Sequence, residues 1–524
     1  MSAQKVTYVT LLQDPTIHEK YERAVQQAKE LFGKHHPMHI AQREVFSDQG
    51  EFEDRSPIDT GIVLGYFQKG TEKHAKEAIE AAKDAFEGWS SQDWRNRVTI
   101  FRKAADIMEQ RKFLLAALIT FEVGKNRFEA IAEAGEAVDM IRYYCDQMET
   151  NEGYVKPMGP GAPGEKSTSV MRPYGVWCVI SPFNFPIALA VSMSTGALLT
   201  GNTVVFKPTS DAPFSGLELY RAYRDGGVPA GVVNFVTGAG GNFEKEFTSN
   251  PDVAGIAFTG SKDVGLKLYK QFVLNQPYPK PFIAELGSKN PTVVTAKAQL
   301  DKAVEGVARA AFGYCGQKCS ATSRVYVQKE LKQAFLERLG QRVQSVAVGD
   351  PTQREAFMGP IINERAYDNF KSYMELAKRD KAIVVAGGSI MTEGNYAKGY
   401  YVQPTVIDGL PRDHRLFKEE LFVPIVLISD FSTLDEAIRE CNNTEYGLTA
   451  GIFTEDKGEM KHFFEKIQFG VTYANRKGGA TTGAWPGAQS FGGWKASGAT
   501  GKGVGGPYYL LQFLREQSQT VVEG

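Results

Sequence analysis

The 524-residue chain lacks the features that mark several large classes of protein. Its 60 Lys and Arg residues balance 61 Asp and Glu residues, so its charge gives no support for a nucleic-acid partner. Its five cysteines are an odd, scattered set that favours a reducing compartment over a disulfide framework, so we expect a cytoplasmic protein. The first ten residues lack the apolar core of a signal peptide. The most apolar region, residues 176–206, is interrupted by proline, asparagine and glycine, whereas a membrane span needs about 20 mainly apolar residues.

Apolar residues make up 42% of the chain, which is enough to form large buried cores. The length of the chain predicts two or three domains. A helical stretch at roughly 17–32 is followed by His35, His36 and His39. Three histidines so close together could bind a metal, but an exposed polar loop is the commoner origin of such a cluster. We therefore expect a loop and no metal.

Two segments, 71–115 and 119–149, predict two or three long amphipathic helices because apolar residues such as Ala78, Ile79 and Ala82 recur at helical spacing. From Gly175 onward, strand-like and helical runs alternate. The strands are expected at 176–180, 203–206, 232–236, 255–258 and 282–285, and the helices near 187–200, 213–225, 242–249 and 263–274. This alternation predicts a parallel, doubly wound sheet that binds its ligand outside the carboxyl ends of the strands.

A second α/β alternation begins after Pro291. Its helices are expected near 301–311, 331–346 and 363–378, and its strands near 325–328, 425–429 and 471–474. A further strand at 167–171 follows a Gly-rich segment, and the tail ends in a strand at 519–522. The sequence therefore predicts two α/β units and two outlying strands.

One cysteine stands in a context that suits catalysis. In FGYCGQKCSATSR (312–324), Gly313 and Gly316 end the preceding helix, and a strand follows, so Cys319 is expected on a loop between two rigid elements. The neighbouring Lys318 would favour the thiolate, which is the nucleophilic form. The alternative for a lone cysteine is a small buried apolar residue, and Cys315 could form a redox or metal pair with it.

Two other residues could complete a catalytic site. Glu285 closes a strand in FIAELGSKNP (282–291), so its carboxylate would face the ligand crevice and could deprotonate water or a thiol. Asn184 lies in the turn ISPFNFP (180–186), from which an amide could donate to a developing oxyanion. Taken alone, each could also be a strand-end or turn residue with no role in catalysis.

Two segments could bind the phosphates or ribose of a nucleotide. FTGSKDVG (258–265) follows a strand and opens a helix, whose N–H groups can hold phosphate. It lacks the Gly-x-Gly-x-x-Gly fingerprint. Lys207, in KPTS, stands at the end of another strand, where it could reach a phosphate or a ribose hydroxyl, or could simply be solvated.

The order and spacing of these motifs, together with KEELFVP around Glu420, resemble the aldehyde dehydrogenase superfamily over about residues 50–515. The resemblance implies an α/β fold with a Rossmann-like cofactor domain, an α/β catalytic domain and a small β oligomerisation hairpin. The implied boundaries are 1–152 and 175–286 for the cofactor domain, 287–476 for the catalytic domain, and 153–174 with 477–524 for the oligomerisation segment. A homodimer or higher homo-oligomer is expected, because the hairpin's strand edge needs covering.

The resemblance also implies the chemistry. Cys319 would attack the aldehyde, Asn184 and the Cys319 backbone N–H would hold the oxyanion, and Glu285 would activate the water that hydrolyses the thioester. The implied cofactor-binding residues are Ser181, Pro182, Lys207, Ser210, Gly238, Gly241, Phe258, Thr259, Gly260, Ser261, Gly265, Leu286, Glu420 and Phe422. NAD is the first choice. NADP is also expected to be accepted, because Ser210 stands where many NAD-preferring relatives carry Glu.

A narrower resemblance links the chain to the 1-pyrroline-5-carboxylate dehydrogenases, which oxidise glutamate semialdehyde to glutamate in proline degradation. It implies substrate contacts by Phe185, Lys318, Ser320, Gly483, Ala484 and Phe491, and no metal. The sequence departs from the pattern at Trp485-Pro486 and Ser490, which bear on the substrate, and at Ser288 and Val423, which suggest local packing changes.

Three other interpretations stay open at this stage. The enzyme could oxidise another carboxylate-bearing or sugar-derived semialdehyde. It could be a cysteine hydrolase or acyltransferase that uses no nucleotide, although the set of cofactor motifs argues against this. It could also be a non-catalytic protein on the same fold, although Cys319, Glu285 and Asn184 are all present.

Overall fold

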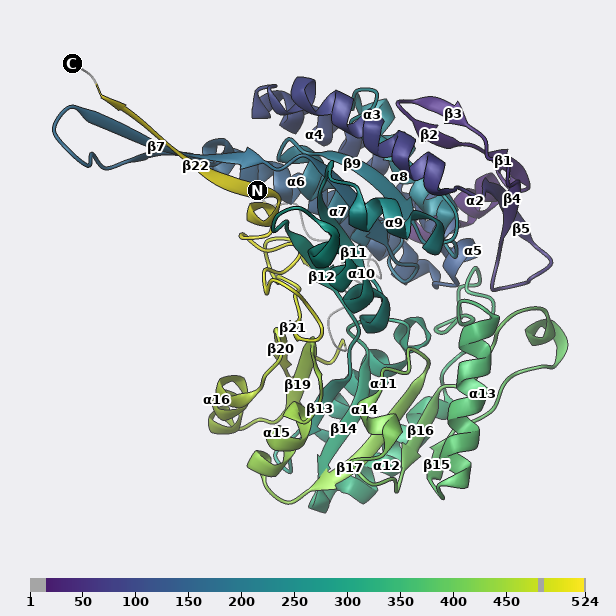
Figure 1. Ribbon diagram of the computed structural model, residues 1–524. Helices are drawn as coiled ribbons and strands as arrows, with labels where there is room; N and C mark the ends of the chain where they lie inside the picture. Colours follow the sequence, from purple (N-terminus) through teal and green to yellow (C-terminus); the bar gives the residue numbers. More distant parts are fainter. Residues whose placement is uncertain (1–15, 479–484, 523–524) are drawn as a thin grey trace.

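The computed structural model describes residues 16–478 and 485–522 and contains two large sheets, each flanked by helices (Figure 1). The first sheet has the strand order β12-β11-β8-β9-β10-β2-β3. Its strands are β2 (Met38–Ile40), β3 (Arg43–Val45), β8 (Val176–Ser181), β9 (Thr203–Pro208), β10 (Val233–Phe235), β11 (Val253–Thr259) and β12 (Phe282–Glu285). The helices between them are α7 (Ala188–Leu199), α8 (Pro213–Gly226), α9 (Gly241–Ser249) and α10 (Lys262–Asn275).

Strands β8 to β12 run parallel to one another, as the alternation predicts. Their near-continuous apolar sequences are buried on both faces, which is typical of a parallel sheet covered by helices. Strands β2 and β3 extend one edge in antiparallel fashion. The predicted doubly wound sheet is confirmed, and its carboxyl edge faces the second sheet.

The N-terminal region contains more helices than the sequence predicts. After α2 (Ile17–Lys29), the region forms α3 (Glu72–Ser90), α4 (Trp94–Gln110), α5 (Lys112–Val123) and α6 (Arg127–Thr150). Four helices replace the two or three expected, because capping residues interrupt the apolar pattern. Asp93 caps α4, Gly124 ends α5 in the left-handed region at φ 77°, and Asn126 caps α6.

The expectation that the three histidines lie in an exposed loop is wrong. His36 ends strand β1 (Lys34–His36) and His39 lies in β2, and both side chains are buried. His39 stacks on Tyr220 with ring centres 4.6 Å apart, so its ring serves as part of the core. Strand β1 joins β4 (Glu51–Arg55) and β5 (Val63–Gln68) in a small sheet. Among the described residues, no group of three or more His, Cys, Asp or Glu could hold a metal ion.

The second sheet has the order β15-β16-β17-β14-β13-β19-β20 and is parallel except at β15. Its strands are β13 (Asn290–Val294), β14 (Thr322–Gln328), β15 (Ile383–Ala386), β16 (Thr405–Asp408), β17 (Ile425–Phe431), β19 (Thr449–Phe453) and β20 (Val471–Ala474). Its helices are α11 (Leu300–Phe312), α12 (Lys329–Gln344), α13 (Glu364–Arg379), α14 (Arg415–Lys418), α15 (Leu434–Asn442) and α16 (Lys457–Lys466). Strands β13, β15, β16 and β19 were not predicted, because they are short runs flanked by proline, glycine or polar residues.

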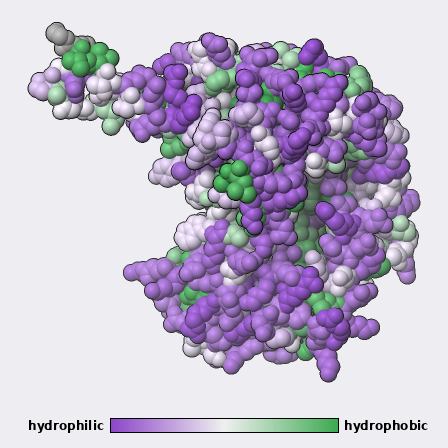
Figure 2. All heavy atoms as spheres, in the orientation of Figure 1, coloured by the Kyte–Doolittle hydropathy of each residue, from purple (hydrophilic) through white to green (hydrophobic). Residues whose placement is uncertain are grey.

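A three-stranded sheet projects from the body of the molecule (Figure 1). Strand β7 (Glu165–Pro173) pairs with β6 (Val155–Met158) and with the C-terminal β22 (Leu514–Val522). Both outlying strands are therefore confirmed, each longer than expected. Figure 2 shows apolar surface near the tip of this sheet, where Val521 and Val522 are 60% and 68% exposed. The helices that the structure describes include none with the length and apolar character of a membrane span.

Candidate active site

Asn184 lies where the sequence predicts, in the turn between β8 and α7. Its side chain is buried, and the aromatic residues on either side anchor the turn. Phe183 packs edge-on against Phe422 with ring centres 5.8 Å apart. The Lys125 Nζ atom lies over the ring of Phe185, 3.4 Å from the ring centre. The amide is therefore held on a rigid turn at the carboxyl edge of the first sheet.

Cys319 lies on the predicted loop of the second sheet, between a short 3-10 helix (Gly313–Gly316) and β14. It packs against the core of the first sheet, and it is partly exposed whereas the other four cysteines are buried. The amide of Asn290 donates to the Cys319 carbonyl oxygen at 2.6 Å, which fixes the backbone of the nucleophile. Sequence reasoning gave Asn290 no role, although it stands in the motif that contains Glu285.

Glu285 ends β12, and its side chain is buried with an Oε1 atom that has no hydrogen-bond partner among the described residues. Burial raises the pKa of Glu285 to about 7, while the neighbouring Cys319 thiol opposes that shift. Burial also raises the pKa of the Cys319 thiol well above its usual range, and the Glu285 carboxylate raises it further. The structure thus places a base with a pKa near neutrality beside the thiol.

The expected activation of Cys319 by Lys318 is wrong. Lys318 Nζ forms an ion pair with Glu129 Oε1 at 2.7 Å, and both side chains are 7% exposed. The charge that dominates around the thiol is instead the negative charge of Glu285. The position of Lys318 next to Cys319 in the sequence did not predict the direction in which the Lys318 ammonium points.

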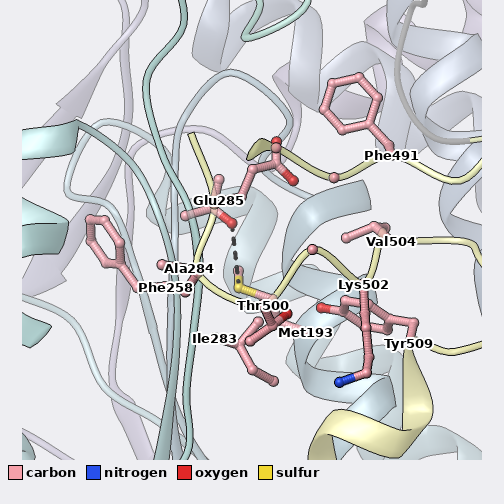
Figure 3. A pocket seen from close by; sticks show the side chains of 16 residues that line it. Met193, Phe258, Ile283, Ala284, Glu285, Phe491, Thr500, Lys502, Val504 and Tyr509 are labelled. Atoms are coloured by element: carbon pink, nitrogen blue, oxygen red, sulfur yellow. Dashed lines mark hydrogen bonds between the residues drawn. The ribbon is translucent and has the colours of Figure 1, made fainter. Parts of the chain in front are cut away.

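Glu285 also borders a pocket, whose lining side chains are drawn in Figure 3. In Figure 3, Glu285 and Phe491 lie at one end of it and Lys502 and Tyr509 at the other. The C-terminal segment forms one wall, and its Ala499 N–H donates to the Ala284 carbonyl at 3.1 Å. The pocket is large enough to hold water beside Glu285.

The predicted phosphate- and ribose-binding residues gather at the carboxyl edge of the first sheet. Ser181 and Pro182 follow β8, Phe258 and Thr259 end β11, and Gly260 and Ser261 lead into α10. Gly265 lies in the first turn of that helix, where a Cβ would collide with Leu286. Thr259 Oγ1 donates to the Met193 sulfur at 3.5 Å, the contact drawn in Figure 3.

Lys207 ends β9 as a buried ammonium. Among the described residues its hydrogen-bond acceptor is the Pro208 carbonyl at 3.0 Å, and burial lowers the pKa of Lys207 to about 8. Ser210 Oγ donates to the Gly238 carbonyl at 3.2 Å, which brings these two predicted residues together, and Gly241 begins α9 close by. A buried cation whose one acceptor in the described part of the chain is a carbonyl has donors to spare for a ribose hydroxyl or a phosphate.

Glu420 and Phe422 line a second pocket, together with Ser288 and Lys318. Glu420 is buried, its Oε1 accepts a hydrogen bond from the Ser288 N–H at 2.7 Å, and burial raises the pKa of Glu420 to about 7. Phe422 has a left-handed backbone with φ 55° and contacts Phe183 of the Asn184 turn. A strained residue with a Cβ at such a position is typical of a functional site.

The predicted substrate contacts are only partly described. Phe185 and Ser320, which follow Asn184 and Cys319 in the chain, have buried side chains. Phe491 is also buried, and it forms an isolated antiparallel bridge with Val504. Lys318 is turned toward Glu129. The predicted anchor residues Gly483 and Ala484 lie outside the described residues.

The whole pattern matches a known family. The sequence profile of the aldehyde dehydrogenase family matches residues 44–519. The chain belongs to the aldehyde dehydrogenase family. The predicted fold is that of this family, since the structure superimposes with a TM-score of 0.94 on 1-pyrroline-5-carboxylate dehydrogenase from Thermus with bound NAD. That protein is 32% identical in sequence, and the match covers 100% of this chain and 99% of that one.

Curated members of the aldehyde dehydrogenase family match at similar lengths. The chain is 36% identical over 507 residues to 1-pyrroline-5-carboxylate dehydrogenase 1 of Halalkalibacterium halodurans, with 96% of each chain covered. It is also 36% identical over 518 residues to 1-pyrroline-5-carboxylate dehydrogenase 2 of Bacillus subtilis, with 98% of each covered.

Two of the departures from the family pattern have local explanations. The Ser288 hydroxyl accepts a hydrogen bond from the Asn290 amide at 3.1 Å, so it supports the residue that fixes the Cys319 backbone. Val423 is buried in the apolar core of the second sheet, so its side chain adds to the packing there. Trp485 lies against the Arg476 guanidinium, with the ring centre 5.0 Å away, and the structure gives no reason for a tryptophan there.

Proposed function

We propose that this aldehyde dehydrogenase oxidises L-glutamate γ-semialdehyde, the open form of 1-pyrroline-5-carboxylate, to L-glutamate with NAD. One observation carries the proposal: Cys319 lies beside Glu285, a base whose pKa is about 7. Both lie near the carboxyl edge of the first sheet, where Asn184 follows strand β8. The substrate is favoured by the near full-length similarity to the 1-pyrroline-5-carboxylate dehydrogenases of Halalkalibacterium halodurans and Bacillus subtilis.

In the first half-reaction the sulfur of Cys319 attacks the aldehyde carbon while Glu285 accepts the thiol proton. The carbon–sulfur bond forms, and the carbonyl oxygen becomes an oxyanion that the Asn184 amide and the Cys319 backbone N–H hold. The oxyanion then collapses to a carbonyl as the hydride leaves, so that a thioester remains on Cys319. NAD, when bound, would accept that hydride.

In the second half-reaction Glu285, after releasing its proton to solvent, accepts a proton from a water molecule. The resulting hydroxyl attacks the thioester carbon, the carbon–sulfur bond breaks, and the acid leaves as the sulfur is freed for the next cycle. A carboxyl with a pKa of about 7 is suited to this double use, because it can both accept and release a proton at neutral pH.

The cofactor would be held by residues that fit a dinucleotide. The buried Lys207 ammonium and the start of α10 at Gly260 and Ser261 supply donors for hydroxyl and phosphate groups, and Glu420 supplies a buried acceptor. The solved structure of the Thermus relative contains NAD. Ser210 in place of an acidic residue leaves room for the 2′-phosphate of NADP, so both cofactors are expected to work, NAD better.

The assembly and the cellular location follow from the same reasoning. The cofactor unit would comprise 1–152 and 175–286, the catalytic unit 287–476, and the oligomerisation segment 153–174 with 477–524. The projecting sheet of β6, β7 and β22 exposes both its edges and its apolar tip, which supports a homodimer or larger homo-oligomer. All five cysteines are free, which suits the reducing cytoplasm.

The test is the rate of NADH formation with glutamate semialdehyde, succinate semialdehyde and propanal, for the wild type and Cys319→Ala. Turnover highest with glutamate semialdehyde, and lost in the variant, is expected. Faster turnover of another aldehyde would overturn the substrate, and full turnover by Cys319→Ala would overturn the nucleophile.

A further inference from the structure

Two buried ion pairs lie beneath the reacting groups. Lys125 Nζ is 2.6 Å from Glu133 Oε2, with side chains 1% and 0% exposed, and Lys318 pairs with Glu129 as described above. Glu129 and Glu133 stand one helical turn apart on α6, so both pairs lie along one face of that helix. We call these four residues the α6 charge cluster. Burying ions is costly even when they are paired, so the cluster points to a role beyond stability.

The first pair holds the turn that carries Asn184. Glu133 Oε1 accepts hydrogen bonds from two successive backbone N–H groups at the start of α7, at 3.0 and 3.3 Å. Lys125, which neutralises that carboxylate, also lies 3.4 Å from the centre of the Phe185 ring, next to Asn184 in the chain. The backbone on the C-terminal side of the amide is therefore fixed by α6.

The second pair holds the loop that carries Cys319. Lys318 directly precedes the nucleophile, and its bond to Glu129 ties the loop to the same helix. Tyr314, in the short 3-10 helix that leads into this loop, has a left-handed φ of 48°, and its ring centre lies 4.8 Å from Lys125 Nζ. Such a conformation persists only where the surroundings enforce it. One helix thus contacts both the turn of the first sheet and the loop of the second.

We propose that the α6 charge cluster aligns the Asn184 amide with Cys319, and that Glu133 is a positioning residue for formation of the thioester. The inference depends on the proposed function, because it assigns Glu133 an effect that acts through the oxyanion donor. It predicts that the charge of Glu133 affects the acylation step and leaves cofactor affinity unchanged.

Glu133→Gln tests this directly, since it keeps the shape of the side chain and removes the charge opposite Lys125. The rate of the first burst of NADH, measured at saturating NAD in a stopped-flow instrument, is expected to fall about 10²-fold, as for other small misplacements of reacting groups. The dissociation constant of NADH and the rate of Cys319 alkylation by iodoacetamide are expected to stay within about twofold of wild type.

Glu122→Gln is the matched control. Glu122 is equally buried and caps the start of α8 as Glu133 caps that of α7, because it accepts from the N–H groups of Phe214 at 2.5 Å and Ser215 at 2.9 Å. Both variants should lose stability. The burst rate of Glu122→Gln at saturating NAD should nevertheless match that of wild type, and an equal loss in both variants would overturn the proposal.

The double variant Asn184→Ala/Glu133→Gln separates positioning from a general structural effect. Asn184→Ala alone should slow the burst about 10²–10³-fold. Because Glu133 acts through Asn184, the double variant should be no slower than Asn184→Ala. Multiplied losses, or an unchanged burst in Glu133→Gln, would overturn the proposal. If Glu133→Gln does not fold, Glu133→Asp replaces it in the same cycle, with its shorter reach expected to give a smaller loss that Asn184→Ala also masks.

The result that would contradict the proposed function differs from the result that would contradict the positioning role of Glu133. An Asn184→Ala variant with the full burst rate would remove the oxyanion donor itself, whereas a slow Asn184→Ala variant beside a fast Glu133→Gln variant would remove only the positioning role.

Discussion

Glu285 and Glu420 are buried carboxylates near Cys319 that line two different pockets, and burial raises the pKa of each to about 7. Their partners differ. Glu420 Oε1 accepts the Ser288 N–H at 2.7 Å, whereas Glu285 Oε1 has no partner among the described residues. The same degree of burial therefore accompanies a backbone hydrogen bond at Glu420, and at Glu285 a contact with the Cys319 thiol and one oxygen that has no partner among the described residues. Hydrogen bonding, more than the pKa, separates the two roles.

The largest expected effect is that of Glu285→Gln on turnover. Removing a general base costs about 10²–10⁴-fold, so kcat should fall by that factor. Because Glu285 also accepts the thiol proton in the first half-reaction, the burst of NADH should be slower than in the wild type and should end at about one NADH per site. Steady-state and burst measurements on the same sample check this. Continued turnover at near wild-type rate would show that another group, or solvent, activates the water.

Glu420→Gln should have a smaller and different effect. Glutamine still accepts the Ser288 N–H, so the local structure should persist, but the charge-assisted hydrogen bond that we propose between Glu420 and the cofactor would be lost. The KM for NAD is expected to rise about tenfold, with a lesser change in kcat. A fall in kcat as large as that of Glu285→Gln would erase the distinction between the two carboxylates.

The dependence of stability on pH gives a third comparison. Because the folded pKa of Glu285 is raised from 4.5 to about 7, the folded state binds more protons between these values, and the stability of the wild type falls as pH rises through that window. Glu285→Gln should therefore be more stable than wild type at pH 8, by at most about 3 kcal/mol, and similar to it at pH 4. Urea unfolding at the two pH values measures this difference, and an equal difference at both would contradict the raised pKa. Turnover by the wild type should rise with pH through about 7, as the base loses its proton.

Ser288→Ala should have the smallest effect. The bond to Glu420 comes from the Ser288 backbone, and Asn290 retains its bonds to the carbonyls of Cys319 and Ala321 at 2.6 and 2.9 Å. The KM for NAD should change less than about twofold. A tenfold rise would mean that the hydroxyl, and not the backbone, positions Glu420.

Much of this site could be predicted because its residues lie at the ends of strongly patterned elements. The strands before Asn184, Lys207 and Glu285 are continuous apolar runs, and the carboxyl ends of parallel strands meet at one edge. The order of motifs then gave the family. Both the doubly wound sheet and the C-terminal strand of the projecting sheet followed from local pattern alone.

The rest depended on contacts between residues far apart in the chain. Lys318 was expected to activate Cys319 because it is adjacent in sequence, but it pairs with Glu129, 189 positions away. The histidines were expected in an exposed loop because they are polar and clustered, yet His39 stacks on Tyr220 in the core. Glu129 and Glu133 were assigned no role from the sequence, yet both are buried and paired with lysines. A single sequence shows which residues are charged, and tertiary packing decides which of them are paired and buried.

The most direct test of the account is to trap the thioester. Glu285→Gln is mixed with NAD and glutamate semialdehyde, quenched in acid, digested and analysed by mass spectrometry. If Cys319 is the nucleophile, a glutamyl group is expected on the peptide that carries it, in about the same amount as the NADH formed. NADH formed without any acyl group on that peptide would contradict covalent catalysis by Cys319.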